Sequence, residues 1–173
     1  MDPERPLKAS FAALLLAQVG AHAAKKFAER LSPLQLTPPY AGILRRLGQS
    51  SGISQRELAS QLNMHASRLV GVVDEMESLG LVVREANTDD RRTYSLQLTP
   101  KGRESLAQIS KISVQHNEAL CAALSLEERE VLTSLLQRIA DQQGLSRGVH
   151  PGYRNLGKAP AGIIKISEKN NAD

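Results

Sequence analysis

Hydrophobic and polar positions along the chain switch from a helical to an alternating pattern near residue 80. Before this point, apolar residues recur at three- and four-residue spacing: Leu69, Val72, Val73, Met76 and Leu79. This spacing predicts a helix from about residue 65 to residue 79, which Gly80 can end because glycine accepts a positive φ. After it, two runs of β-branched or alternating apolar residues, 81–86 and 93–98, flank a polar tip at 87–92. These runs predict a β-hairpin.

A shorter helix is predicted just before this long helix. Ser54 and Glu57 have the spacing of a capping box, in which the serine hydroxyl accepts from the third helical amide while the glutamate reaches back. The apolar face of this helix consists of Leu58, Ala59 and Leu62. Asn63 marks a break before the second helix. The predicted order is a short helix, a tight turn, a longer helix and a hairpin. This is the order of a winged helix-turn-helix, whose second helix enters the DNA major groove.

The flanking segments predict longer helices with extensive apolar faces. Residues 7–31 form the first of them. Threonine–proline pairs at 37–38 and 99–100 each supply an N-cap followed by a proline at the first helical position. Ser125 opens the last helix with a second capping box. A single subunit offers too little surface to bury both faces of such terminal helices, so we interpret them as dimerisation elements.

These elements predict a mainly α protein with a small β-hairpin wing: a winged helix-turn-helix with N- and C-terminal dimerisation helices. The expected regions are an N-terminal dimerisation helix (1–36), a DNA-binding lobe (37–99), C-terminal dimerisation helices (100–143) and a basic tail containing Gly and Pro (144–173). We interpret the tail as a solvated extension. The alternative is a segment that packs over the partner subunit or touches DNA.

Several motifs occur in a specific order along the chain. They are Leu-Thr-Pro-Pro-Tyr-Ala-Gly-Ile-Leu (36–44), Leu-Ala-Ser-Gln-Leu-Asn-Met (58–64), the run 73–82, Asp-Arg-Arg (90–92) and Leu-Thr-Pro-Lys-Gly (98–102). In this order and spacing, over about residues 7–143, the chain resembles the multiple antibiotic resistance regulator (MarR) family. The resemblance implies a homodimeric regulator that binds double-stranded DNA, commonly a repressor on an inverted-repeat operator. It also implies terminal helices interleaved across a two-fold axis, with the two recognition helices about one DNA turn apart.

The N-terminal end of the second helix carries the residues expected to contact DNA. His65, Ser67, Arg68 and Gly71 lie outside the apolar face, and Arg56 on the preceding helix is a further candidate. Arg68 can reach a guanine edge or a phosphate, and Ser67 can donate to a phosphate. The alternatives are that Arg68 is a solvated surface arginine and that His65 only caps the helix. Many relatives carry a larger polar residue where Gly71 stands.

The hairpin tip is the second expected DNA contact. The family pattern implies that one arginine of the run Asp90, Arg91 and Arg92 enters the minor groove, with Asp90 orienting it. A narrow minor groove at A·T-rich sequence attracts arginine. The alternative is an exposed salt-bridge network that contributes little to stability. The sequence leaves open which arginine inserts.

A small-molecule effector is a further implication of the resemblance. The family pocket lies where the first, second and fifth helices meet beside the DNA-binding lobe, and aromatic carboxylates or phenols are frequent occupants. The candidates by position are Phe11, His22, Tyr40 and Arg45. The alternative is that Phe11 and Tyr40 only fill the core or an interface.

Composition restricts the partners and the cellular compartment that we expect for this protein. The net charge of +4 and pI near 9.4 favour anionic partners. Acidic residues outnumber basic ones between residues 54 and 99, so the cations there must gather on one surface if the lobe binds DNA. Neither a membrane-spanning apolar run nor an export leader is present, and one cysteine in 173 residues fits a reducing cytoplasm.

Other functional classes are less consistent with the sequence. There is no glycine-rich phosphate loop, nucleophile motif or metal-spaced Cys/His pair, so neither an enzyme nor a metal or cofactor site is expected. Cys121 leaves a redox-sensing regulator as an alternative, but its apolar neighbours suggest a small buried hydrophobe. A helical partner-binding module is the alternative that does not bind DNA.

Overall fold

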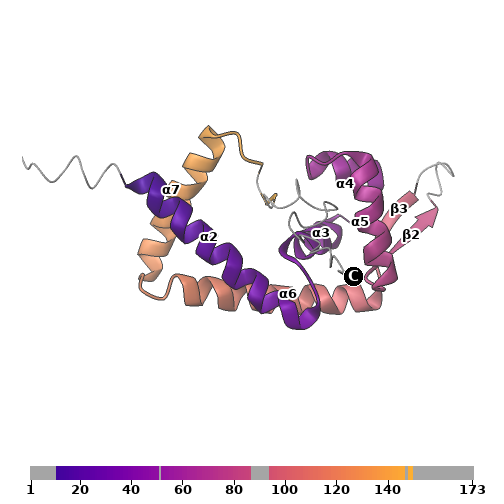
Figure 1. The fold of residues 1–173 in the computed structure, drawn as a ribbon, viewed down its shortest axis with the longest axis horizontal. Helices are drawn as coiled ribbons and strands as arrows, with labels where there is room; N and C mark the ends of the chain where they lie inside the picture. The colour runs from indigo at the N-terminus through magenta and orange to yellow at the C-terminus, as the bar shows by residue number, and fades with distance from the viewer. Residues whose placement is uncertain (1–10, 51, 87–93, 147, 150–173) are drawn as a thin grey trace, which may run out of the picture.

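A computed structural model describes residues 11–50, 52–86, 94–146 and 148–149 (Figure 1). Two helices precede the DNA-binding lobe's central motif: α2 (Ala12–Leu31), followed by a short 3-10 turn η1 (Ser32–Leu34), and α3 (Pro38–Gln49). The motif comprises β1 (Ile53–Ser54), α4 (Gln55–Gln61), α5 (Ala66–Ser78), β2 (Val82–Ala86) and β3 (Tyr94–Leu98). Two long helices follow, α6 (Pro100–Leu120) and α7 (Leu126–Gln142). The predicted order of helix, turn, helix and hairpin is confirmed.

Helix starts depend on the side chains that the sequence indicated, with one exception. The Ser125 hydroxyl accepts from the Glu128 amide at 3.2 Å and the Glu128 carboxylate accepts from the Ser125 amide at 2.8 Å, which completes the capping box. The Ser54 hydroxyl accepts from the Glu57 amide at 3.1 Å, the serine half of the predicted box. Thr37 occupies the N-cap of α3, but its side chain makes no capping hydrogen bond. The proline that follows Thr37 therefore starts this helix through its fixed φ.

The sheet has three antiparallel strands in the order β1-β3-β2. In the predicted hairpin, Val82 pairs with Leu98 and Ala86 pairs with Tyr94. The short strand β1 adds to the other edge of β3 through the pair Ile53 and Leu96. Sequence reasoning missed β1 because a two-residue strand is too short to show an alternating pattern.

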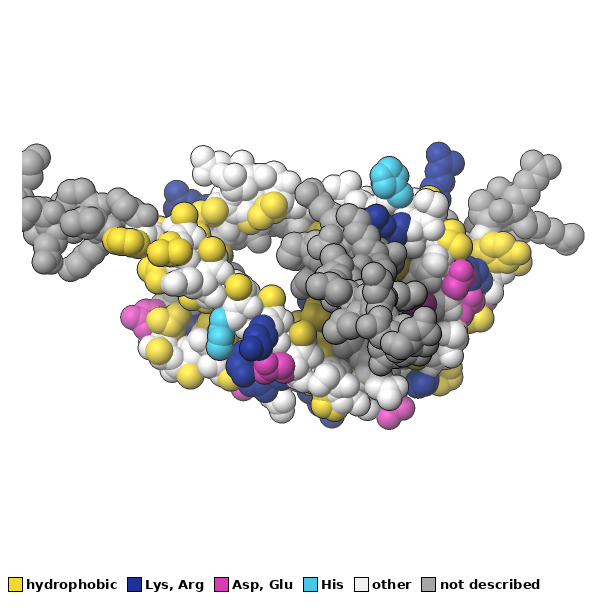
Figure 2. Space-filling view, in the orientation of Figure 1, with side chains coloured by type: hydrophobic (Ala, Val, Ile, Leu, Met, Phe, Trp, Pro, Cys, Tyr) yellow, Lys and Arg dark blue, Asp and Glu magenta, His cyan; other side chains and the backbone are white. Residues whose placement is uncertain are grey.

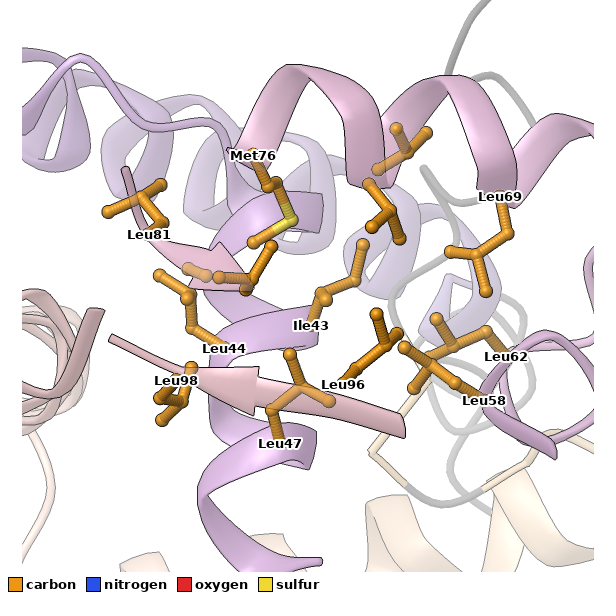
Figure 3. Packing of buried hydrophobic residues seen from close by; sticks show 14 of the residues in the cluster. Ile43, Leu44, Leu47, Leu58, Leu62, Leu69, Met76, Leu81, Leu96 and Leu98 are labelled. Atoms are coloured by element: carbon orange, nitrogen blue, oxygen red, sulfur yellow. The ribbon is translucent and has the colours of Figure 1, made fainter. Parts of the chain in front are cut away.

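The hydrophobic core lies inside the DNA-binding lobe. Figure 3 shows Ile43, Leu44 and Leu47 of α3 between the helix-turn-helix and the sheet, with Leu69 and Met76 of α5 above them. All nine of the largest fully buried side chains lie between Leu31 and Leu96. Burial of these side chains fixes the orientation of α5, because its apolar stripe points into the lobe and its other faces point outward.

The arms are built differently. We use this term for α2, the C-terminal half of α6, and α7, which lie at the opposite end of the molecule from β2 and β3 (Figure 1). No described residue of α7 is buried. Hydrophobic side chains remain exposed on all three helices (Figure 2), including Leu14, Leu15, Val19, Val114, Leu126, Val131, Leu135 and Ile139. Apolar surface of this extent is typical of an association interface.

The first residues after α7 return to the lobe. Val149 packs against the hydrophobic core, and Gly148 lies beside Arg45 and Arg46 of α3 in a shallow pocket. This part of the tail is therefore not the fully solvated extension that its composition indicated. Residues 150–173 lie outside the described part of the chain.

Candidate nucleic-acid interface

The N-terminal end of α5 presents an open polar face. His65 is the N-cap residue, but its ring makes no capping hydrogen bond and is exposed. Ser67 is exposed, and Arg68 is half-buried. Gly71 adds no side chain to this face, and a Cβ built there would meet no atom within 4 Å. Four of the five predicted contacts of the helix-turn-helix therefore lie together at one helix end, consistent with insertion of this end into a groove.

A hollow of about 380 Å³ lies along this face, lined by Ser67, Arg68, Gly71, Val72 and Glu75. The fifth predicted contact, Arg56, is exposed in the first turn of α4. Basic side chains and a histidine project from the edge where α4 and α5 meet (Figure 2). This edge provides the gathered cations that DNA binding requires of a lobe with excess acidic residues.

Two of those acidic residues pair with one arginine that sequence reasoning did not single out. Arg84 of β2 pairs with Asp74 at 2.6 Å and with Glu77, both on α5. Its backbone amide also donates to the Glu77 carboxylate at 2.9 Å, and its Nε donates to the Gln55 side chain of α4 at 3.2 Å. Arg84 therefore joins the wing strand to both helices of the motif. Because Arg84 lies on a different element from Asp74 and Glu77, no period within one helix or strand predicts the contact, and only the packed hairpin reveals it.

A second contact links α5 to the rest of the lobe. The hydroxyl of Tyr40 on α3 donates to the carboxylate of Glu75 on α5. Tyr40 is also one of the predicted ligand contacts, and in this structure its hydroxyl is hydrogen-bonded to α5. The contact holds the carboxylate of Glu75, which lines the hollow described above.

The remaining predicted ligand residues do not share one cavity in the single chain. Phe11 is 48% exposed at the N-terminus of α2. His22 lines a cleft of about 340 Å³ between α2 and α6. Arg45 lines a cavity of about 50 Å³ with Phe27, Pro38, Ala41, Gly42, Ile109 and Ser113, where α2, α3 and α6 meet. Only Arg45 therefore lies at the junction that the resemblance implied.

Cys121 is the C-cap residue of α6 and is half-buried, less enclosed than its apolar neighbours suggested. Its carbonyl accepts a hydrogen bond from Arg129 Nε at 3.0 Å. Among the described residues, no group of three His, Cys, Asp or Glu side chains could hold a metal ion. No described helix is long and apolar enough to cross a membrane. The predicted wing contacts Asp90, Arg91 and Arg92 lie outside the described residues.

Known proteins share this architecture. A family model described as the MarR family matches residues 34–93. A putative transcriptional regulatory protein for the hcr operon of Thauera aromatica is 35% identical over 119 residues, covering 68% of this chain and 72% of the relative. An HTH-type transcriptional repressor of Mycobacterium tuberculosis is 32% identical over 126 residues, covering 72% of this chain and 90% of the relative.

Solved structures agree with these relatives. The transcriptional repressor CouR bound to a 23-mer DNA duplex matches with a TM-score of 0.69 and 30% identity, over 81% of this chain and 99% of CouR. CouR bound to p-coumaroyl-CoA matches with a TM-score of 0.65 and 29% identity, over 76% of this chain and 93% of CouR. Fold, sequence and motif order lead to the same conclusion: the chain belongs to the MarR family of transcriptional regulators.

Proposed function

We propose that this protein is a homodimeric repressor that binds an inverted-repeat operator in double-stranded DNA. The observation that carries the proposal is the open N-terminal end of α5, where exposed His65, Ser67 and Gly71 lie together with half-buried Arg68. The similar repressor CouR, whose structure is bound to a 23-mer DNA duplex, supports the same use of the fold. Because DNA is the proposed partner, the protein acts in the cytoplasm, by binding rather than by catalysis.

The arms support the proposed homodimer and its inverted-repeat operator. Their exposed apolar side chains would be covered by a second copy of the chain, which places two α5 helices on one DNA molecule. Two helices related by a two-fold axis read two half-sites of opposite orientation. The proposed operator is therefore an inverted repeat with half-sites about one helical turn apart.

A salt titration with operator and scrambled duplexes tests the proposal. Arg68→Ala should reduce discrimination against mutated operators by roughly 1–3 kcal/mol per half-site if Arg68 contacts a base. Replacing Arg91 and Arg92 together with alanine should weaken operator binding and lower the magnitude of the log–log salt slope by about 0.9 for each lost phosphate contact. Each lost contact is lost twice per dimer, because both subunits carry the substitution.

Arg138→Ala is the matched control, since it removes an exposed arginine from α7, far from the lobe. It should leave operator binding unchanged. Equal binding of wild-type protein to both duplexes would contradict sequence-specific recognition. Wild-type behaviour of folded, dimeric Arg68 and wing variants would contradict the assigned contacts. Failure to bind any duplex would instead favour a helical module that binds another protein.

We also propose that a small organic acid releases the repressor from DNA. The support is the junction cavity beside Arg45 and the structure of CouR bound to p-coumaroyl-CoA. The cavity of about 50 Å³ is smaller than typical ligand pockets of roughly 300–1,000 Å³, so it must open when a ligand binds. The ligand must also prefer the state that cannot bind DNA, because equal affinity shifts nothing. Calorimetry with simple phenolic acids that showed neither heat nor altered DNA affinity would contradict this ligand class.

A further inference from the structure

Val70 is an apolar residue on the side of α5 that faces away from the core of the lobe. It is 43% exposed, whereas the apolar stripe of the same helix is buried. The structure describes every residue of α5, and no other large apolar side chain on this helix is exposed. Val70 follows the exposed residues Ala66 and Ser67 by one helical turn, so it continues the face that begins at the N-terminal end of α5.

The stability of the fold gives no reason for a valine at this position. A β-branched side chain has a lower helix propensity than alanine, and an exposed side chain contributes little hydrophobic stabilisation. A single apolar residue on an ordinary surface would need no explanation. Val70, however, lies between the open end of α5 and the hairpin, because the guanidinium of Arg84 on β2 donates to the Val70 carbonyl at 3.4 Å. It therefore belongs to the surface proposed to contact DNA.

The same arginine holds the helix turn that carries Val70. Through the same Nη2 atom, Arg84 also pairs with Asp74, one turn further along α5. These contacts tie this turn to strand β2, which lies beside α5 (Figure 1). A valine in a helix has one strongly preferred χ1 rotamer. The two methyl groups of Val70 are therefore held in place before any partner binds, which lowers the entropic cost of a contact.

The residue after Val70 permits a close approach to the helix. Gly71 has no side chain, and a Cβ built there would meet no atom within 4 Å. Gly71 also lines the hollow of about 380 Å³ along this face. Valine extends only one carbon beyond its Cβ, so it can touch another molecule only if the helix backbone comes near. A glycine beside it allows such an approach.

We propose that Val70 contacts the 5-methyl group of a thymine in the major groove of each operator half-site, and that Gly71 lets α5 come close enough for this contact. The side chain of valine has neither a hydrogen-bond donor nor an acceptor. Among the groups that base edges display in the major groove, the thymine methyl is the apolar one. The inference rests on the proposed repressor function and adds to it a specificity-determining residue and the base that this residue reads.

The test removes a methyl group from the DNA without changing base pairing. The full-length protein first selects its operator from a random pool of duplexes. Each thymine of the selected half-site is then replaced by deoxyuridine, at symmetric positions in both half-sites. Uracil pairs with adenine as thymine does and lacks only the 5-methyl group. At one position, wild-type protein should lose affinity about fourfold per half-site, and roughly 15-fold per dimer, the effect of one methyl-sized group left unburied.

Val70→Ala should remove this sensitivity. The variant should bind the thymine operator more weakly than wild-type protein does, and deoxyuridine should change its affinity less than about twofold. An effect of uracil on DNA shape would instead persist in the variant. Alanine is the better helix former, so the variant should fold at least as well as wild-type protein.

Val83→Ala is the matched control. It removes the same two methyl groups from an exposed position on β2. Its side chain lies on the opposite sheet face from that of buried Val82, because neighbouring side chains of a strand alternate. The control variant should keep the full penalty for deoxyuridine. Loss of the penalty in both variants would show that Val70 is not the residue that reads the methyl group.

Gly71→Ala tests the close approach. The added Cβ has open space in the free protein, so it should raise the thermal unfolding temperature. At the DNA surface the same Cβ should hold the helix away, which should lower operator affinity at least about fivefold, the smallest usual effect of overpacking. It should also reduce the penalty for deoxyuridine. Unchanged operator affinity of the folded variant would overturn the close approach.

Failure of this inference differs from failure of the proposed function. A selected half-site that contains no thymine sensitive to deoxyuridine would overturn the methyl contact and leave the repressor function intact. A sensitivity that Val70→Ala retains would do the same. A protein that selects no sequence from the pool would contradict the proposed function itself, and the thymine contact with it.

Discussion

The DNA-binding lobe and the arms use apolar residues in opposite ways. In the lobe, Leu69, Val72, Val73 and Met76 of α5 are all buried. On α7, Leu132, Leu135, Leu136 and Ile139 repeat a similar spacing, yet each remains 36–47% exposed. The lobe therefore completes its own core within one chain, whereas the arms leave a hydrophobic face for a partner. Helical spacing indicates an apolar stripe, and the comparison shows that it does not indicate which molecule covers the stripe.

The largest expected effect is on the arms. Leu135→Asp places a charge within the apolar stripe of α7, and it should weaken dimerisation by at least about 2 kcal/mol, roughly 30-fold, because the charge would be desolvated at the interface. Operator affinity should fall with it. Analytical ultracentrifugation and a DNA-shift assay measure both quantities.

Ser134→Asp is the matched control for this change. Ser134 lies on the polar side of the same helix, approximately opposite the apolar stripe at 100° per residue. It should leave the dimer intact. If Leu135→Asp also remained dimeric, the apolar stripe of α7 would not be covered by a second copy of the chain.

The next largest effect is expected where the lobe meets the start of α6. Gly102 lies in the first turn of α6, and a Cβ there would overlap the Leu81 carbonyl oxygen, which is backbone and cannot rotate away. Gly102→Ala should therefore lower the free energy of unfolding by about 1–3 kcal/mol. Urea denaturation measures this loss. Gly20→Ala in α2 has open space and should instead raise stability by roughly 0.5–1 kcal/mol, so destabilisation of both variants to the same degree would contradict the close contact.

Within the lobe, Arg84→Ala tests two roles of this side chain: its contribution to the stability of the fold and its contribution to the charge balance on α5. Removing a side chain that is 19% exposed and pairs with Asp74 and Glu77 should cost about 1–3 kcal/mol of stability. Operator affinity at low salt should also fall, because two carboxylates on the recognition helix lose their counter-charge. Asp74→Asn added to Arg84→Ala should restore part of that affinity. Unchanged DNA affinity of a folded Arg84→Ala dimer would show that these carboxylates lie too far from DNA to matter.

The smallest effect is expected at Cys121. Its half-buried position at the end of α6 identifies no role for the thiol, so Cys121→Ser should retain operator binding and any inducer response. Shift assays with and without peroxide measure this directly. A peroxide response in wild-type protein that disappears in the variant, with folding unchanged, would restore the redox alternative.

Local chemistry was sufficient to predict the order of elements and the recognition helix. Ser54, Ser125 and Gly80 predicted helix ends because caps and positive φ depend on neighbouring residues alone. The apolar stripe of α5 predicted in turn which residues point outward. Most of the candidate DNA contacts followed from that stripe, since the residues left outside it must face the solvent or a partner.

Only the tertiary structure decided the contacts between distant segments. The Arg84 pairs, the Tyr40 contact with Glu75, strand β1 and the packing of Val149 join residues separated by loops or whole elements. No period in the sequence predicts them, because they depend on how the elements pack rather than on how each forms. The sequence by itself therefore determined the helices, the hairpin and the exposed end of α5, through interactions within a few residues. Folding decided the charge balance around α5 and the cleft between α2 and α6, because electrostatic contacts act between side chains that only packing brings together.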